Sequence, residues 1–262
     1  MTPRNSSALI AVAVALCAPA AWAQTSQQCA MNGARGGGYQ RYVNPNPVYD
    51  GRVTFVRLWY ATGGGSGRRG GDTQWQHDYP RAERNFTRLL TELTAVKVRV
   101  DESNVMALDD PDLFKHPIAY MSEPGFWYPS ESEVLGLRNY LLKGGFLIFD
   151  DFAGRDILNL QRQMVRVLPE MRLIELNADH PVFDTFFRVR TLDYYHSYQC
   201  IKSVFYGIFQ DNDPKKRMLA IVNDNSDMGE AWEWSADGLF PIEMSNDMYK
   251  LGINYFMYAL TR

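Results

Sequence analysis

The sequence predicts an α/β fold, a three-layer sandwich in which helices cover both faces of a mainly parallel central sheet. Segments rich in β-branched and aromatic residues alternate along the chain with segments whose apolar residues recur at helical spacing. Residues 146–149 are all apolar, as is typical of a central strand buried on both faces. Such alternation favours parallel strands joined by helices on the two faces of the sheet.

The first 23 residues have the order of a secretory signal peptide. A short polar start with Arg4 precedes an apolar run at 8–17, and the small residues Ala21 and Ala23 mark a cleavage site. The apolar run is shorter than the about 20 residues that span a bilayer, and a retained N-terminal anchor helix is the alternative. We expect cleavage after Ala23 and a periplasmic or secreted protein that is not an integral membrane protein.

The remaining chain divides into a tail and one domain. Residues 24–51 carry many Gln, Asn, Gly and Pro residues without a sustained period, which predicts a flexible N-terminal tail. Residues 52–262 contain neither an internal repeat nor a linker, so we expect a single α/β domain.

The first half of this domain begins with a strand at 53–59, which is rich in β-branched and aromatic residues. Asp78 can cap the next helix, with Pro80 in its first turn, and apolar residues continue at helical spacing to Leu93. Two further strands are expected at 96–100 and 118–121.

The second half begins with a helix that has clear start and stop signals. Ser130 and Glu133 have the spacing of a capping box, and Gly144 is suited to end the helix. The apolar strand at 146–149 follows and is closed by Asp150 and Asp151. The later elements are expected to be a helix at 157–167, a strand at 173–176, a strand pair at 205–209 and 218–222, and a helix at 247–260.

Composition limits the classes of function. A hydrophobic content of 46% excludes a disordered chain, and a net charge of −3 argues against a nucleic-acid partner, which requires a basic face. Three cysteines are too few for a disulfide scaffold. Cys17 leaves with the signal peptide, so that Cys29 and Cys200 either form a disulfide after export or remain unpaired thiols.

Three segments are expected at the carboxyl edge of the sheet, where open α/β folds bind their ligands. They are the glycine-rich loop at 62–71, the loop at 122–127, and the pair Asp150 and Asp151. The glycine-rich loop carries Arg68 and Arg69 and is able to surround an anion, but it matches no phosphate-binding fingerprint, so an ordinary surface loop is the favoured interpretation.

Asp150 and Asp151 are the leading acidic candidates for chemistry, as general bases or metal ligands. His180 would complete an acid–base cluster if the fold brought it to them. The structural alternatives are that an aspartate caps the following helix and that His180, which precedes a proline, belongs to a turn. The segment 223–230 does not match the EF-hand pattern, and we predict neither a bound metal nor a cofactor.

Spaced motifs follow one another in a fixed order along the domain and include Phe55, Arg57, Tyr60, Trp75, Asp78, Tyr79, Pro80, Glu83, Asn85, Phe86, His116, Arg138, Gly144, Gly145, Asp150, Asp151, Phe152, Asp179, His180, Pro181, Phe183 and Asn254. Together they resemble one bacterial family, domain of unknown function 4159, across residues 52–262. The resemblance implies a fold similar to that of class I glutamine amidotransferases, which is flavodoxin-like. The catalytic cysteine elbow and the His-x-Glu pair of those enzymes are missing, since Pro181 and Val182 follow His180, and amidotransferase activity is not expected.

The resulting hypothesis is an exported envelope protein whose non-catalytic domain binds a ligand or partner, either an envelope protein or a glycan. Besides the acidic pair and His180, the residues expected to bind the ligand are Arg68, Arg69, Trp75, Asp78 and Glu83. The alternative is an enzyme, a hydrolase of a carbohydrate or envelope polymer in which Asp150 or Asp151 acts as a base or metal ligand. A scaffold subunit without a small-molecule site is a third possibility.

Overall fold

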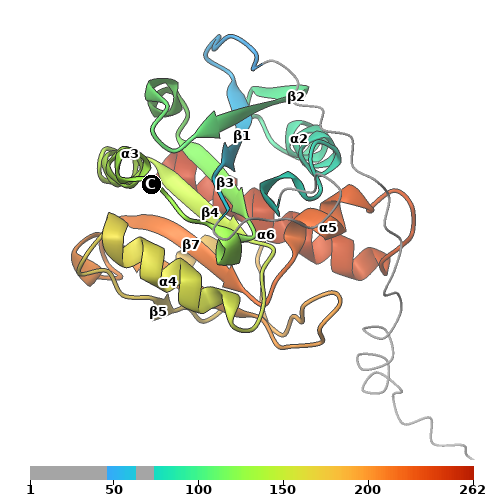
Figure 1. The fold of residues 1–262 in the computed structure, drawn as a ribbon. Coiled ribbons are helices and arrows are strands. Elements are labelled where there is room, and N and C mark those ends of the chain that lie inside the picture. The colour runs from blue at the N-terminus through green and yellow to red at the C-terminus, as the bar shows by residue number, and fades with distance from the viewer. Residues whose placement is uncertain (1–45, 63–73) are drawn as a thin grey trace, which may run out of the picture.

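The structure, a computed structural model, describes residues 46–62 and 74–262 and has an α/β fold (Figure 1). The expected signal peptide, most of the expected tail, Cys29, Arg68 and Arg69 lie outside the described residues. The strands of the sheet are β1 (Val53–Trp59), β2 (Val98–Ala107), β3 (Ile118–Ser122), β4 (Phe146–Asp150), β5 (Ile174–Glu175), β6 (Val204–Phe209) and β7 (Met218–Asp224).

The seven strands form one mixed sheet in the order β2-β1-β3-β4-β7-β6-β5. Neighbours from β2 to β7 pair in parallel, whereas β6 pairs antiparallel with β7 and β5 antiparallel with β6. The carboxyl ends of β1, β3, β4 and β7 therefore meet at the same edge of the sheet. The expected strand pair at 205–209 and 218–222 is confirmed, and the structure shows that its two strands are antiparallel.

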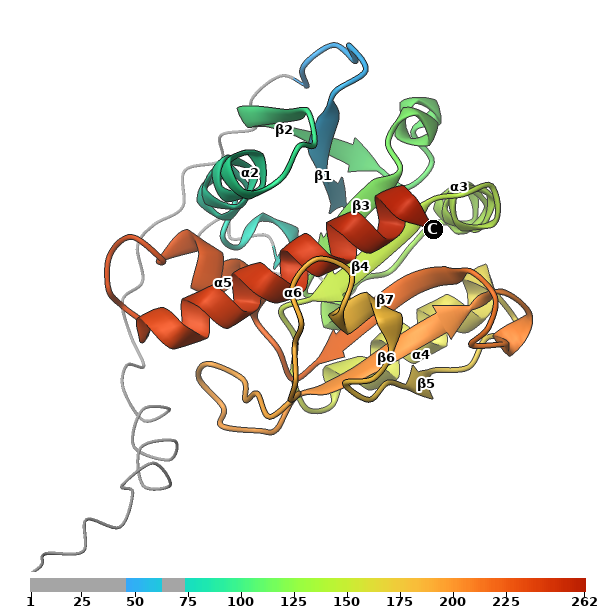
Figure 2. The ribbon, with the colours of Figure 1, turned by 180° about the vertical axis from the view of Figure 1, so that it is seen from behind.

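Helices pack on both faces of the sheet (Figures 1 and 2). Figure 2 shows α6 crossing one face together with α2 and α5, and Figure 1 shows α4 in front of the other face, with α3 beside it. Among the described residues, no helix combines the length and apolar character needed to cross a membrane. The helices are α2 (Arg81–Leu93), α3 (Glu131–Leu142), α4 (Asp156–Val167), α5 (Met228–Glu233) and α6 (Ile242–Thr261).

The central strand β4 divides its side chains between two hydrophobic cores. Phe146 and Ile148 belong to the core beneath α2 and α6, and Leu147 and Phe149 to the core beneath α3 and α4. All four side chains are buried, because successive residues of a strand point to opposite faces and both faces are covered. The prediction of a central strand at 146–149 is confirmed.

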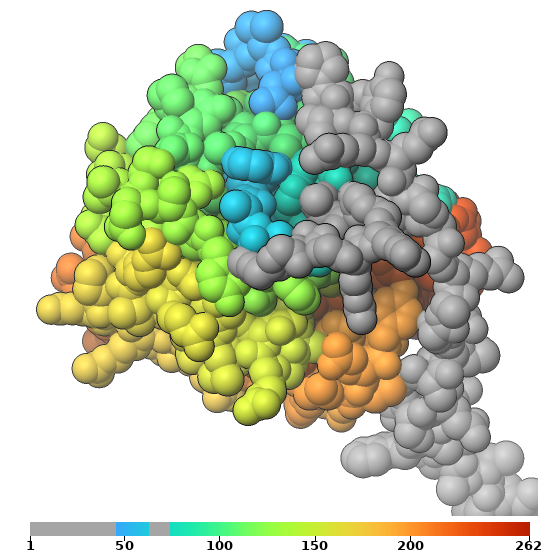
Figure 3. Space-filling model, viewed as in Figure 1, coloured from blue at the N-terminus to red at the C-terminus, as the bar shows by residue number. Residues whose placement is uncertain are grey.

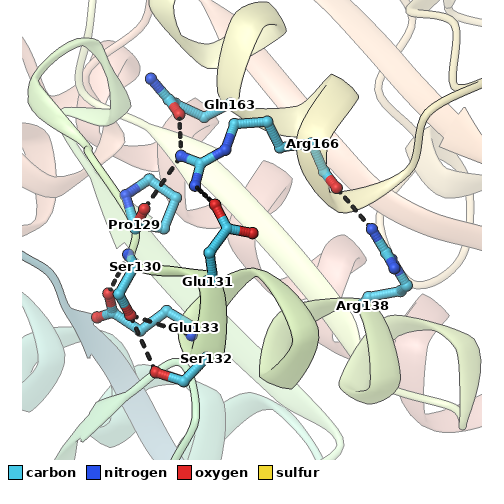
Figure 4. A network of polar contacts seen from close by, with 8 residues as sticks. All are labelled: Pro129, Ser130, Glu131, Ser132, Glu133, Arg138, Gln163 and Arg166. Carbon is cyan, nitrogen blue, oxygen red and sulfur yellow. Dashed lines mark hydrogen bonds and ion pairs between the residues drawn. The ribbon is translucent and has the colours of Figure 1, made fainter.

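A polar network joins α3 to α4 on one face (Figure 4). The capping box is present: the Ser130 side chain accepts from the backbone N–H of Glu133, whose carboxylate accepts from the backbone N–H of Ser130. Arg166 of α4 donates to Glu131 and to the carbonyl of Pro129. Arg138 of α3 donates to the carbonyl oxygens at the end of α4, and the two helices are thereby held in register.

Some boundaries differ from the predictions. The cap expected at Asp78 is wrong, since α2 begins at Arg81 without a side-chain cap and the Asp78 backbone has a left-handed φ of 65°. β2 continues beyond 100 to Ala107, and α6 begins at Ile242 instead of 247. β2 continues through polar residues because it pairs with β1 along this stretch. Local composition does not predict such an extension, since it depends on a strand elsewhere in the chain.

Candidate functional site

A cleft of about 440 Å³ lies at the carboxyl edge of the sheet. Its walls come from segments that follow β3, β4 and β7, from the segment before α2, and from the segment before β6. Figure 3 shows part of this face, where the surfaces of the segment after β4 (yellow-green) and the segment before β6 (orange) adjoin. The lining residues are His77, Asp78, Glu123, Phe126, Asp151, Phe152, Ala153, Asp156, His196, Tyr198, Gln199, Asp227 and Glu230.

Asp151 lies in the cleft because the chain turns sharply at the end of β4. Its backbone is left-handed, with φ at 59°, a conformation that aspartate tolerates better than most residues. One carboxylate oxygen accepts a hydrogen bond of 2.8 Å from the Ser122 hydroxyl. Burial, and then the charge of Glu123, raise the pKa of Asp151 to about 8.

Asp150, the preceding residue, has a different environment and does not line the cleft. Its carboxylate is fully buried and accepts hydrogen bonds from the Tyr120 hydroxyl at 2.8 Å and the Asn223 amide at 3.1 Å. It also accepts from the backbone N–H groups of Met228 at 2.8 Å and Gly229 at 3.3 Å, at the start of α5. Asp150 thus ties β3, β4 and β7 to α5, which is a structural role.

Two more buried aspartates approach Asp151 from other segments. Asp227 caps α5 by accepting from the backbone N–H of Glu230 at 3.0 Å. Asp78 is 2% exposed, and its Oδ2 has no hydrogen-bond partner. Burial, and then the charge of Asp151, raise the pKa values of both Asp78 and Asp227 well above the usual range.

The ionisable groups of the cleft form overlapping sets whose ligand atoms lie within 4.8 Å of one another. None of the described lining residues is Lys or Arg. The cleft therefore gathers several carboxyl groups in a partly desolvated space without a basic partner among these residues. A cationic ligand would compensate them and displace the protons that their raised pKa values retain. The sets are Asp78, Asp151 and Asp227; His77, Glu123 and Asp151; and Asp78, Glu230 and Glu233.

Two residues expected to bind a ligand, Trp75 and Glu83, lie behind the cleft and do not line it. Both are buried, at 4% and 1% exposed. Arg57 forms a buried ion pair with Glu83 and donates to the carbonyls of Trp75 at 3.0 Å and His77 at 2.8 Å. This arrangement fixes the segment that carries Asp78, so Trp75 and Glu83 support the cleft indirectly.

His180 is not brought together with the acidic pair. Its ring packs against Phe209 and Tyr258, with ring centroids 5.7 and 6.1 Å apart, and its Nδ1 accepts from the N–H of Val182. Tyr258 also packs against Phe146, the first residue of β4. Asp150 ends that five-residue strand, about 13 Å away at roughly 3.3 Å per residue. His180 therefore lies toward the amino edge of the sheet, far from the cleft.

The sequence matches the family model for a domain of unknown function (DUF4159) over residues 54–260. The chain belongs to the DUF4159 family. The match covers every described residue of the cleft, and no curated protein matches the sequence.

Sequence reasoning missed several residues of the DUF4159 cleft. Glu123 belongs to the loop at 122–127, which the sequence places at this edge without indicating a role for its carboxylate. Asp227 and Glu230 lie in the segment 223–230, which does not match an EF-hand and therefore gives no motif that predicts a ligand. The available signal was the density of acidic residues directly after the buried strand β7, at the same edge as Asp151.

Gly229→Ala should lower the stability of the DUF4159 domain by about 1–3 kcal/mol, measured by urea denaturation. A Cβ at this position would lie 2.2 Å from Asp78 Oδ2 and 3.0 Å from the Tyr120 hydroxyl, so the side chains would have to move. Adding Asp78→Gly removes one of the two overlaps and suits the left-handed backbone at 78. An unchanged stability of Gly229→Ala, or a double variant no more stable than Gly229→Ala, would contradict the close approach of Asp78 to Gly229.

Proposed function

We propose that the DUF4159 domain binds a positively charged ligand in the acidic cleft and has no amidotransferase activity. The observation that carries the proposal is the convergence of Asp78, Asp151 and Asp227 with an unpartnered oxygen on Asp78. Buried carboxylates are costly unless a cation or hydrogen-bond donors compensate them, and the described lining residues include no Lys or Arg. A cationic ligand would supply the missing compensation.

We further propose that the protein acts outside the cytoplasm, as an envelope protein whose partner is another envelope protein or a glycan. The support is the order of features in residues 1–23, with cleavage after Ala23, leaving the tail at 24–51 and the domain at 52–262. A mainly parallel three-layer fold like that of class I glutamine amidotransferases is part of the same proposal. The described residues that line the cleft include no cysteine and no His-x-Glu pair, which fits the proposed lack of amidotransferase activity.

A hydrolase of a carbohydrate or envelope polymer is the second candidate. It is favoured by two aromatic residues of the cleft, Phe126 and Tyr198, which are 40% and 43% exposed and are able to stack on sugar rings beside the carboxylates. Asp151 would be its acidic group, since the Asp150 carboxylate already accepts four hydrogen bonds. Cleavage of an amino-sugar oligosaccharide by the wild-type protein but not by Asp151→Asn would favour this candidate.

Thermal denaturation with a panel of cations tests the binding proposal. The panel consists of divalent metal chlorides, spermidine and an amino-sugar oligosaccharide, added after dialysis against EDTA. At ten times its Kd, a ligand should raise the melting temperature by about 4 °C. Asp151→Asn should abolish this shift, whereas the control Glu243→Gln, at an exposed position on α6, should preserve it. If no cation stabilises the wild-type protein, the proposal fails.

A further inference from the structure

Three aspartates from separate parts of the chain present their oxygen atoms to one point in the cleft. Asp78 precedes α2, Asp151 follows β4, and Asp227 caps α5, yet their ligand atoms lie within 4.8 Å of one another. Asp78 and Asp227 are buried and Asp151 is half-buried. Like charges this close in a desolvated space repel strongly unless a counter-charge is present.

Neighbouring contacts fix two of these carboxylates and leave the third without a donor. The Ser122 hydroxyl binds Asp151, and the backbone N–H of Glu230 binds Asp227. Asp78 Oδ2 is buried and has no hydrogen-bond partner, although a backbone amide or a hydroxyl usually satisfies a buried carboxylate oxygen. Gly229 permits the approach of this oxygen, because any side chain there would overlap it. The unpartnered oxygen is a second observation, independent of the clustering, that points to a ligand.

We propose that Asp78, Asp151 and Asp227 bind one divalent cation of the oxygen-preferring class, Mg²⁺, Ca²⁺ or Mn²⁺. This inference rests on the proposed function and names its ligand. Carboxylate oxygens are the ligands these ions prefer, whereas Zn²⁺ favours sites with imidazole or thiolate ligands. Three carboxylates leave part of the coordination shell of such an ion to water or to oxygen atoms of a second ligand. The bound cation would thus join the acidic cleft to a hydroxylated or anionic molecule.

The test measures metal binding to the EDTA-treated full-length protein by isothermal titration calorimetry and thermal denaturation, with MgCl₂, CaCl₂, MnCl₂ and ZnCl₂. The variant Asp227→Asn removes one charge and retains a side-chain oxygen able to cap α5. The matched control is Asp184→Asn, which makes the same change at an exposed position outside the cleft. Melting curves without metal establish that both variants fold.

We expect one oxygen-preferring ion to bind each wild-type chain. Its affinity should fall at least tenfold in Asp227→Asn and should stay within threefold of the wild-type value in Asp184→Asn. Equal affinity in the wild type and Asp227→Asn would overturn the assignment, as would binding of Zn²⁺ alone that His77→Gln abolishes. Stabilisation by spermidine or the amino sugar without any metal binding overturns this inference but leaves the proposed function intact. If neither a metal ion nor an organic cation binds, both the metal-site inference and the proposed function fail.

Discussion

Replacing Arg57 with methionine should lower the free energy of unfolding by about 3–5 kcal/mol, and the melting temperature by roughly 10 °C. Arg57 is fully buried and neutralises Glu83, which is itself 1% exposed. The variant leaves the Glu83 charge without a counter-ion in a desolvated environment, and it removes the donor to the carbonyls of Trp75 and His77. Urea denaturation followed by tryptophan fluorescence measures the loss.

The double variant Arg57→Met with Glu83→Met separates the two causes. It removes the unpaired charge, so it should recover about half of the stability lost in the single variant. The part of the unfolding free energy that is not recovered measures the loss of the hydrogen bonds to the carbonyls of Trp75 and His77, because methionine has no donor for them. A loss below about 1 kcal/mol in the single variant, or a double variant no more stable than the single, would contradict the account of a buried ion pair.

The sequence predicts best those elements whose signals are local. β4 is apolar throughout because both of its faces are covered, and the capping box at Ser130 satisfies backbone groups within a single turn. The full length of β2 and the start of α6 depend on partners far away in the chain, and the predicted boundaries are wrong there. The family, the α/β fold and the strand pair formed by β6 and β7 follow from the sequence.

The cleft is harder to predict because its charges come from distant segments. The carboxyl edge and the place of Asp151 on it follow from the alternation of strands and helices that local patterns predict. Asp78 and Asp227 approach Asp151 for two reasons. Arg57 holds the segment that carries Asp78, and Gly229 has no side chain that would overlap with Asp78. Adjacent residues in a sequence can also have opposite roles, as Asp150 and Asp151 do, when a left-handed residue at the end of a strand changes the direction of the chain.

Asp150→Ala should destabilise the domain by about 4 kcal/mol or more, in contrast to Asp151→Asn. The alanine leaves the Tyr120 hydroxyl, the Asn223 amide and two N–H groups of α5 without their acceptor, and each buried unsatisfied group costs about 1–3 kcal/mol. Asp151→Asn keeps an acceptor for Ser122 and removes a carboxyl group whose raised pKa means that its ionised form is disfavoured in the folded protein. Without metal, its stability at neutral pH should therefore equal or exceed that of the wild type.

The comparison is made by urea denaturation in EDTA, with ligand binding measured on the same samples. Asp150→Asn, which retains one carbonyl oxygen, should lie between the wild type and Asp150→Ala in stability. Equal stability of Asp150→Ala and the wild type would contradict the structural role of Asp150, because four donors converge on its carboxylate. Asp150→Asn could instead be stable and yet lose ligand binding as completely as Asp151→Asn. That result would place both aspartates in direct contact with the ligand and would contradict the geometry of the cleft, which Asp150 does not line.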